Sequence, residues 1–261
     1  MEFQNKTILI TGGGSGFGLA SAKQFAALGG RVLVVDRQEQ RAQEVVASLE
    51  SPTGAKHLAI IRDLRPAESA REIVAEALDK AGAPDVLVSS AGVCHFNAIN
   101  AISPEEWDEV LEIDLRALFY VGVAAAEAMK AAGKGGSIIN LASNAARKGR
   151  ALSAHYAAAK AGVVSVTESL ALAYGPANIR VNTVSPAVVL TPMWEQNFAE
   201  LVKITGKTPA QLAEAWTNQT PLRRLGSPDD IANLIVFLAG PKAEFITGQH
   251  INVCGGFMHT C

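Results

Sequence analysis

Apolar residues along this chain follow two alternating patterns. Short runs that are apolar almost throughout are typical of buried strands, whereas longer segments with apolar residues on one face are typical of helices. The short runs predict strands near 6–11, 31–36, 57–62, 85–90, 136–142, 179–185 and 248–253. The longer segments predict helices near 17–29, 38–50, 66–82, 105–131, 153–174 and 227–239. Because most of these strands have no polar face, we expect a parallel sheet covered on both faces.

The regular alternation of strand and helix predicts the fold class. It predicts an α/β protein with a doubly wound, seven-stranded parallel sheet of order 3-2-1-4-5-6-7, a Rossmann-type fold. No linker, repeat or low-complexity segment divides the chain, so we expect a single domain over residues 1–261. Residues 187–226 interrupt the pattern and contain Trp194, Phe198 and Trp216. A stretch of this length on the ligand side of the sheet usually forms a lid.

Composition narrows the class of protein. The chain has 261 residues, of which 49% are hydrophobic and 18% charged, enough for one domain with a sizeable core. A net charge of −2 gives no reason to expect nucleic acid or a membrane as a partner. The three cysteines, Cys94, Cys254 and Cys261, show no CxxC spacing and indicate reduced thiols in a cytoplasmic protein. No cluster of His, Cys and carboxylates has metal-ligand spacing, so we expect no catalytic metal.

A glycine-rich segment follows the first predicted strand directly. Its spacing is Gly-x-x-x-Gly-x-Gly, and a predicted helix begins within it. This arrangement presents free backbone N–H groups to a phosphate, and a side chain at the glycines would block the pyrophosphate or strain the turn. The alternative is a glycine-rich surface turn. The residues expected to bind a dinucleotide here are Gly12, Ser15, Gly16, Phe17 and Gly18.

The second predicted strand ends in an acidic residue, Asp36, eighteen positions after Gly18. A carboxylate at this place can accept both hydroxyls of an adenosine ribose and would repel a 2′-phosphate. We therefore expect NAD as the cofactor. Arg37 is the opposing feature, since an arginine here could pair with the 2′-phosphate of NADP, which remains the less favoured cofactor.

Tyr156 and Lys160 form a YxxxK pair, thirteen residues after Ser143. Residues at i and i+4 share one helix face, so the ammonium would lie beside the phenol. A free tyrosine has a pKa of about 10, and a neighbouring cation favours the phenolate and lowers that pKa. The pair could then exchange a proton with an alcohol or carbonyl oxygen, which the Ser143 hydroxyl would hold. Taken alone, the pair could also be an exposed helix face.

With these motifs the chain resembles the short-chain dehydrogenase/reductase family in its NAD-type branch, over essentially its whole length. Thr11–Gly18 resemble the family's TGxxxGxG, and Ser89-Ser90-Ala91-Gly92 stand where its Asn-Asn-Ala-Gly is found. The resemblance also implies an adenine contact at Asp63-Leu64 and a nicotinamide carboxamide contact within Pro186–Thr191. The cofactor-binding residues that it adds are Asp63, Leu64, Ser90, Ala91, Gly92, Tyr156, Lys160, Val189 and Thr191.

The resemblance implies an activity and an assembly. A secondary alcohol and its ketone would be interconverted, with Tyr156 moving the proton, Ser143 holding the oxygen and Lys160 binding the nicotinamide ribose. The predicted helices near 105–131 and 153–174 would pack against a second subunit, giving a homotetramer or a dimer.

One departure from the family touches the catalytic residues. The family's asparagine in a W-x(6)-N pattern is Asp114 here, seven residues after Trp107. Near Lys160, its carboxylate would offset part of the ammonium's field, so the Tyr156 pKa would be lowered less than usual. The alternative is that Asp114 points away and caps the helix bend. The expected catalytic residues are Ser143, Tyr156, Lys160 and Asp114.

The substrate is a small alcohol or ketone, expected to be a polyol, sugar or hydroxy acid. Ser15 stands where many NADPH-linked ketoacyl reductases of the family carry a basic residue, so a 3-ketoacyl reductase is the less favoured alternative. A second alternative is an NAD-binding sensor with little turnover, which only the Asp114 departure and the missing amides support. The residues expected near the substrate are His95, Ala145 and Trp194, although a histidine of this kind could equally be a packed side chain.

Overall fold

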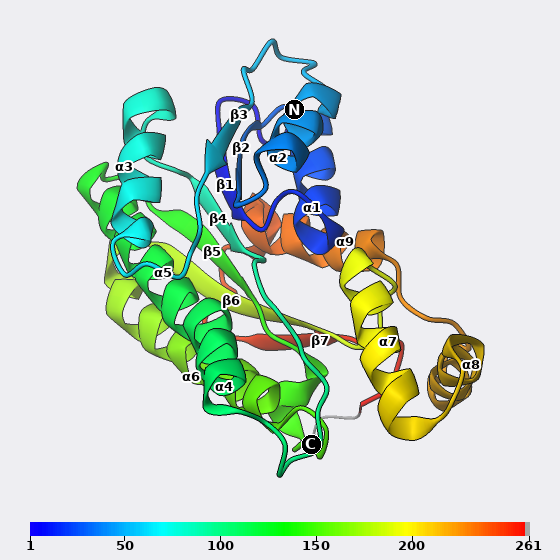
Figure 1. Ribbon diagram of the computed structural model, residues 1–261. Helices are drawn as coiled ribbons and strands as arrows, with labels where there is room; N and C mark the ends of the chain where they lie inside the picture. The colour runs from blue at the N-terminus through cyan, green and yellow to red at the C-terminus, as the bar shows by residue number, and fades with distance from the viewer. Residues whose placement is uncertain (259–261) are drawn as a thin grey trace.

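The computed structural model describes residues 1–258, without the side chains of residues 195 and 196 (Figure 1). One sheet contains strands β1 (Thr7–Thr11), β2 (Arg31–Asp36), β3 (Leu58–Ile61), β4 (Val86–Ser89), β5 (Gly136–Leu141), β6 (Ile179–Pro186) and β7 (His250–Val253). Every neighbouring pair is parallel, in the order β3-β2-β1-β4-β5-β6-β7. The predicted fold class and strand order are therefore confirmed.

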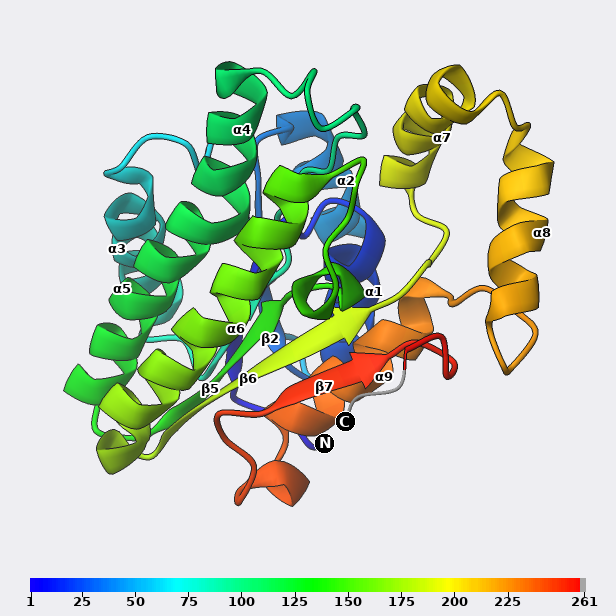
Figure 2. The same ribbon diagram turned by 90° about the horizontal axis from the view of Figure 1, so that it is seen from below.

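Helices cover both faces of this sheet, as Figures 1 and 2 show. One face is covered by α1 (Gly16–Ala27), α2 (Glu39–Ser48) and α9 (Pro228–Ala239). The opposite layer contains α3 (Ser69–Ala81), α4 (Pro104–Leu111), α5 (Leu118–Ala131) and α6 (Ala154–Tyr174). Short 3-10 helices lie at η2 (Asn144–Arg147), η3 (Gly175–Ala177) and η4 (Pro241–Ala243). Among the described residues, no helix is both long enough and apolar enough to cross a membrane.

Alternation along the strands explains why these segments are apolar throughout. Ile8 and Ile10 of β1 pack into the cluster beneath α1, α2 and α9, whereas Leu9 packs into the cluster beneath α3, α5 and α6. Successive side chains of a strand point to opposite faces, so burial of both faces requires apolar residues at both parities.

The segment predicted as one helix over 105–131 is interrupted. A π-helix, η1 (Glu112–Ala117), separates α4 from α5 and contains Asp114. Such wide turns occur mostly as single insertions within α-helices, frequently at functional sites. Sequence periodicity does not reveal this one, because both flanking helices keep their apolar faces against the same layer. Asp114, the residue that differs from the resembled W-x(6)-N pattern, therefore lies within this wider turn.

The segment 187–226 contains two helices, α7 (Pro192–Thr205) and α8 (Pro209–Gln219). Each begins with a proline in its first turn, and Thr208 and Gln211 form a capping box that starts α8. Figure 2 shows both helices standing apart from the main layers, near the ends of β6 and β7. The ring centres of Trp194 and Trp216 lie 5.0 Å apart and join α7 to α8. The role of residues 187–226 as a lid stays a prediction.

Candidate active site

Most of the expected site residues line one cavity of about 380 Å³. It lies where the loops after β1, β2, β4, β5 and β6 meet α7, at the carboxyl edge of the sheet, where ligands of doubly wound folds bind. The expected residues on its wall are Gly12, Ser15, Gly16, Phe17, Asp36, Asp63, Leu64, Ser90, Ala91, Gly92, Ser143, Ala145, Tyr156, Thr191 and Trp194.

The remaining expected residues do not line this cavity. Gly18 packs against the loop, since a Cβ there would come within 2.3 Å of the Gly12 carbonyl oxygen. The Val189 side chain is buried in the core and its backbone bridges to Gly226. The implied nicotinamide contact, through the backbone of this segment and Thr191, stays a prediction. Lys160 and Asp114 are buried behind the wall.

The glycine loop fits a dinucleotide phosphate. Gly12 has φ +65°, and a Cβ there would lie 2.7 Å from the Ala91 Cα, so no larger residue fits. Gly16 has φ +52° and begins α1, while the Ser15 side chain makes no capping hydrogen bond. The first N–H groups of the helix are therefore free to bind an anion in the cavity.

At the other end of the cavity lie acidic and basic side chains. Asp36 accepts hydrogen bonds from the N–H groups of Gly14 (3.1 Å) and Gln38 (3.0 Å), which orient its carboxylate. Arg65 hydrogen-bonds to Asp63 and holds the pKa of that carboxyl below its usual range. Both side chains are therefore held in place on the cavity wall, and their role toward an adenosine stays a prediction. Three arginines that line the same end are Arg37, Arg41 and Arg62.

Lys160 forms a buried ion pair instead of facing the cavity alone. Its Nζ lies 3.2 Å from Asp114 Oδ2, donates to the Leu141 carbonyl oxygen (2.9 Å) and lies 5.5 Å from the Tyr156 ring centre. Asp114 is 0% exposed, and its Oδ1 accepts the Val93 N–H at 2.7 Å. Asp114 therefore faces the lysine rather than pointing away from it.

This pairing changes the expectation for Tyr156. Burial raises the pKa of Tyr156 well above its usual value, and the Cys94 and Asp114 side chains act in the same direction. The Ser143 hydroxyl and the Arg150 guanidinium oppose this effect. The lowered Tyr156 pKa that the YxxxK spacing predicts is therefore wrong for this structure. The physical reason is that the tyrosine is partly buried and that Asp114 offsets the charge of Lys160.

Ser143 is held at the end of β5 by local hydrogen bonds. Its Oγ accepts the Ala145 N–H (3.1 Å) and lies 3.3 Å from Asn144 Oδ1. The same Asn144 oxygen accepts a hydrogen bond from Arg150 Nη2 at 2.9 Å. Asn144 and Arg150 both line the cavity, and the sequence analysis missed them. The only available signal was a cationic residue in the loop shortly before Tyr156.

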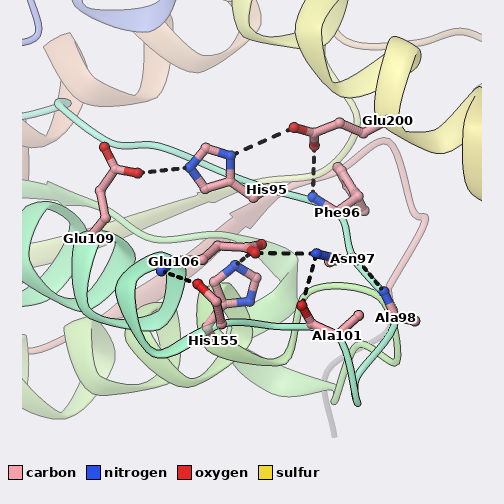
Figure 3. A network of polar contacts seen from close by, with 10 residues as sticks. His95, Phe96, Asn97, Ala98, Ala101, Glu106, Glu109, His155 and Glu200 are labelled. Carbon is pink, nitrogen blue, oxygen red and sulfur yellow. Dashed lines mark hydrogen bonds and ion pairs between the residues drawn. The ribbon is translucent and has the colours of Figure 1, made fainter.

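His95 lies outside the cavity, in a network shown in Figure 3. Its Nε2 is 3.2 Å from Glu109 Oε2 on α4, and its Nδ1 is 3.7 Å from Glu200 Oε1 on α7. His155 is fully buried beside Glu106, at 3.3 Å, and burial lowers the pKa of His155. The expected substrate contact of His95 is not supported, because two carboxylates draw its ring to the side of the site.

Comparison with known proteins decides the family. A family model described as enoyl-(acyl carrier protein) reductase matches residues 12–258. Galactitol 2-dehydrogenase of Agrobacterium fabrum is 36% identical over 98% of both chains. The chain belongs to the short-chain dehydrogenase/reductase family. Another member, L-rhamnose 1-dehydrogenase (NAD(P)(+)) of Azotobacter vinelandii, is 34% identical over 97% of this chain and 96% of its own.

A solved structure of the family agrees in fold as well as in sequence. The crystal structure described as short-chain dehydrogenase/reductase SDR:glucose/ribitol dehydrogenase from Brucella melitensis has a TM-score of 0.87 and 36% identity. The match covers 99% of each chain. The protein is therefore an oxidoreductase of the short-chain dehydrogenase/reductase family.

Proposed function

We propose that the protein is an NAD-dependent dehydrogenase that interconverts a secondary alcohol and its ketone. The observation that carries this proposal is the convergence of Ser143 and Tyr156 on one cavity wall, with Lys160 directly behind them and the glycine loop in the same cavity. A hydroxyl, a phenol and an ammonium so arranged can hold a carbonyl oxygen and transfer a proton to it.

The protein's own residues handle the oxygen and its proton. When bound, NAD(P) supplies or accepts the hydride at the substrate carbon. Because its pKa is raised, Tyr156 is protonated near neutral pH and can donate its proton to a ketone oxygen. Alcohol oxidation needs the phenolate, so it should be favoured on the alkaline side. Ser143 would hydrogen-bond to the same oxygen as its charge changes.

Asp36 supports NAD as the preferred cofactor. Its carboxylate lines the adenosine end of the cavity, where it would accept ribose hydroxyls and repel a 2′-phosphate. Arg37 and Arg41 line the same end and would moderate that preference. One relative is named for NAD(P)(+), so the family membership alone does not choose between the two dinucleotides.

The named relatives support a substrate class. The relatives named above act on galactitol and on rhamnose, which supports a small hydroxylated molecule. We propose a secondary alcohol of that size, turned over by a cytoplasmic homotetramer with residues 187–226 as its lid. Neither nucleic acid nor a membrane is needed for this activity.

The test is NADH formation when protein and NAD are screened against secondary alcohols, followed by the variant Tyr156→Phe. This variant keeps the ring but removes the acid, so turnover should fall by about a hundredfold or more while NAD still binds. Tyr120→Phe, at an exposed tyrosine on α5, is the matched control and should keep full turnover once light scattering shows that it assembles like the parent. Near-normal turnover in Tyr156→Phe would overturn the mechanism. Tight NAD binding with no alcohol oxidised would instead favour the sensor.

A further inference from the structure

We infer that the substrate is a hydroxy acid: its carboxylate, one or two carbons from the carbinol carbon, binds Arg150, and its apolar body lies against the aromatic side chains of the lid. This inference rests on the proposed function and narrows it to one substrate class. Its starting point is Arg150, a cation in the part of the cavity next to Ser143 and Tyr156, which is called the catalytic half here.

Arg150 is the charged side chain of that half. The other charged residues on the described wall belong to the adenosine end. Arg150 is partly buried, and burial lowers its pKa, yet a guanidinium stays protonated at any physiological pH. Among the described residues, no carboxylate lies within ion-pair distance of it. A cation withdrawn from water is costly unless an anion pairs with it, so the open cavity is where that anion belongs.

The guanidinium keeps donors available for such an anion. It has five N–H donors, and its one side-chain hydrogen bond to a described residue goes from Nη2 to Asn144 Oδ1. That contact fixes the plane of the fork and leaves other N–H groups for a carboxylate. Arginine binds carboxylates through two parallel hydrogen bonds, which gives both strength and direction.

The position of Arg150 limits the distance between the two substrate groups. Asn144 Oδ1 accepts from Arg150 at 2.9 Å and lies 3.3 Å from Ser143 Oγ, so a single shared acceptor separates the guanidinium from the serine. Ser143 would hold the reacting oxygen. A carboxylate bound to Arg150 therefore lies next to the carbinol carbon, as in 2-hydroxy and 3-hydroxy acids, and not at the far end of a long chain.

Most of the remaining wall of the catalytic half is apolar, and its polar side chains besides Asn144 are Ser153 and Asn197. Side chains on its wall are Phe96, Met193, Trp194, Trp216 and Phe257. The Phe96 and Trp194 ring centres lie 6.2 Å apart, and Trp194 packs on Trp216. A polyol or sugar carries a hydroxyl on nearly every carbon, and most of these would lose their hydrogen bonds to water against such a wall. An aryl or alkyl group would be stabilised there instead.

The experiment compares matched substrates. With NAD, kcat/KM is measured for 3-hydroxy-3-phenylpropanoate and for the neutral 1-phenylpropane-1,3-diol, and likewise for mandelate and 1-phenylethane-1,2-diol. The parent should prefer the acid of at least one pair. In Arg150→Met, the ratio of acid to diol should fall by about thirtyfold or more, because a charge-assisted pair of hydrogen bonds is lost. Arg150→Lys should keep part of the ratio, since it retains a point charge.

The matched control is Lys148→Met, which removes an exposed cation from the same loop and should leave the ratio unchanged. Circular dichroism checks that Arg150→Met is folded, and Arg150→Gln replaces it if it is not. A parent that prefers both diols, or galactitol, over the acids would overturn the inference. So would an Arg150 variant that lowers acid and diol turnover equally, because that result indicates a structural role.

A binding measurement separates this inference from the proposed function. In Tyr156→Phe saturated with NADH, calorimetry measures binding of the oxo acid 3-oxo-3-phenylpropanoate with and without Arg150→Met. The affinity for the oxo acid should be about thirtyfold or more lower in the double variant than in Tyr156→Phe. In Tyr156→Phe the binding should weaken as salt is added. If no alcohol is ever oxidised but this Arg150-dependent binding is found, the proposed function fails while the carboxylate site stands. Equal affinity in both proteins would overturn the site itself.

Discussion

Replacement of Asp114 by asparagine should shift the pH dependence of alcohol oxidation toward lower pH. The carboxylate lies 3.2 Å from the Lys160 ammonium, and both groups are buried. Besides burial, the Cys94 and Asp114 side chains raise the pKa of Tyr156. Burial raises the pKa of the Cys94 thiol, which stays neutral in the assay range. Burial also raises the pKa of Asp114, but the Lys160 ammonium and the Val93 N–H oppose this effect, so Asp114 is the group that carries negative charge on the alkaline side. Its removal therefore favours the phenolate.

The size of the shift follows from the distances. A full ammonium 5.5 Å from the Tyr156 ring centre would stabilise the phenolate by about 3 kcal/mol at an effective dielectric constant of about 20. This corresponds to about two pKa units. The Asp114 carboxylate is one ion-pair length from the ammonium, and its opposite charge cancels more than half of that field. Asp114→Asn should therefore lower the Tyr156 pKa by about one unit.

The assay is kcat/KM for alcohol oxidation at saturating NAD, from about pH 6 to about pH 10. Because oxidation needs the phenolate, the rising limb should move to lower pH by about one unit without loss of the maximal rate. A substrate deuterated at the carbinol carbon verifies that hydride transfer limits the rate. Asp108→Asn, which removes an exposed carboxylate from α4, is the control and should not shift the limb. A profile of Asp114→Asn that superimposes on the parent's, or moves to higher pH, would refute this reasoning.

Three further predictions concern the cofactor, the assembly and acid stability. In Asp36→Ala the NAD/NADP preference ratio should fall by about tenfold or more, about 1.4 kcal/mol, and an unchanged ratio would mean that this carboxylate is not at the ribose. Tyr120 on α5 and Leu172 on α6 are 49% and 82% exposed, so we expect these helices to pack against further subunits; a monomer by light scattering at micromolar concentration would contradict the homotetramer. Burial lowers the pKa of His250 from 6.5 to about 4, so the stability that its neutral form contributes is complete above about pH 6.5 and is lost as the pH falls toward 4. In His250→Gln the free energy of unfolding by urea should therefore decrease less between about pH 7 and about pH 5 than in the parent; an equal decrease would show that another group titrates.

Local pattern was enough for the sheet and for the YxxxK pair. The strand β1 over Thr7–Thr11 lies within one residue of the expected 6–11. Every residue of it is buried, as expected for a parallel sheet that is covered on both faces. Tyr156 and Lys160 needed only helical geometry, since four residues along a helix return a side chain to the same face. Gly12 and Gly16 both have positive φ values, which favour glycine, and Gly12 also lies too close to Ala91 for a side chain.

Features that depend on contacts between distant segments could not be predicted from the sequence. The π-helix at Glu112–Ala117 differs from the flanking helices by a single wider turn, which periodicity does not register. His95 has the same sequence signal whether it faces a substrate or, as here, Glu109 and Glu200 from two other elements. Arg150 looked like an ordinary loop cation until folding placed it on the cavity wall beside Asn144.

The Tyr156 pKa shows most clearly what the sequence determines and what only the tertiary structure determines. From the chain alone, the spacing to Lys160 placed an ammonium beside the phenol and predicted a lowered pKa. Folding reversed the direction, because it partly buried the tyrosine and brought a second charge, Asp114, against the lysine. Hydrophobic periodicity and i, i+4 spacing are short-range properties, so the sequence was enough for the fold and for placing Tyr156 and Lys160 on one helix face. Desolvation and the balance of opposite charges depend on which distant groups meet, and only the tertiary structure decides that.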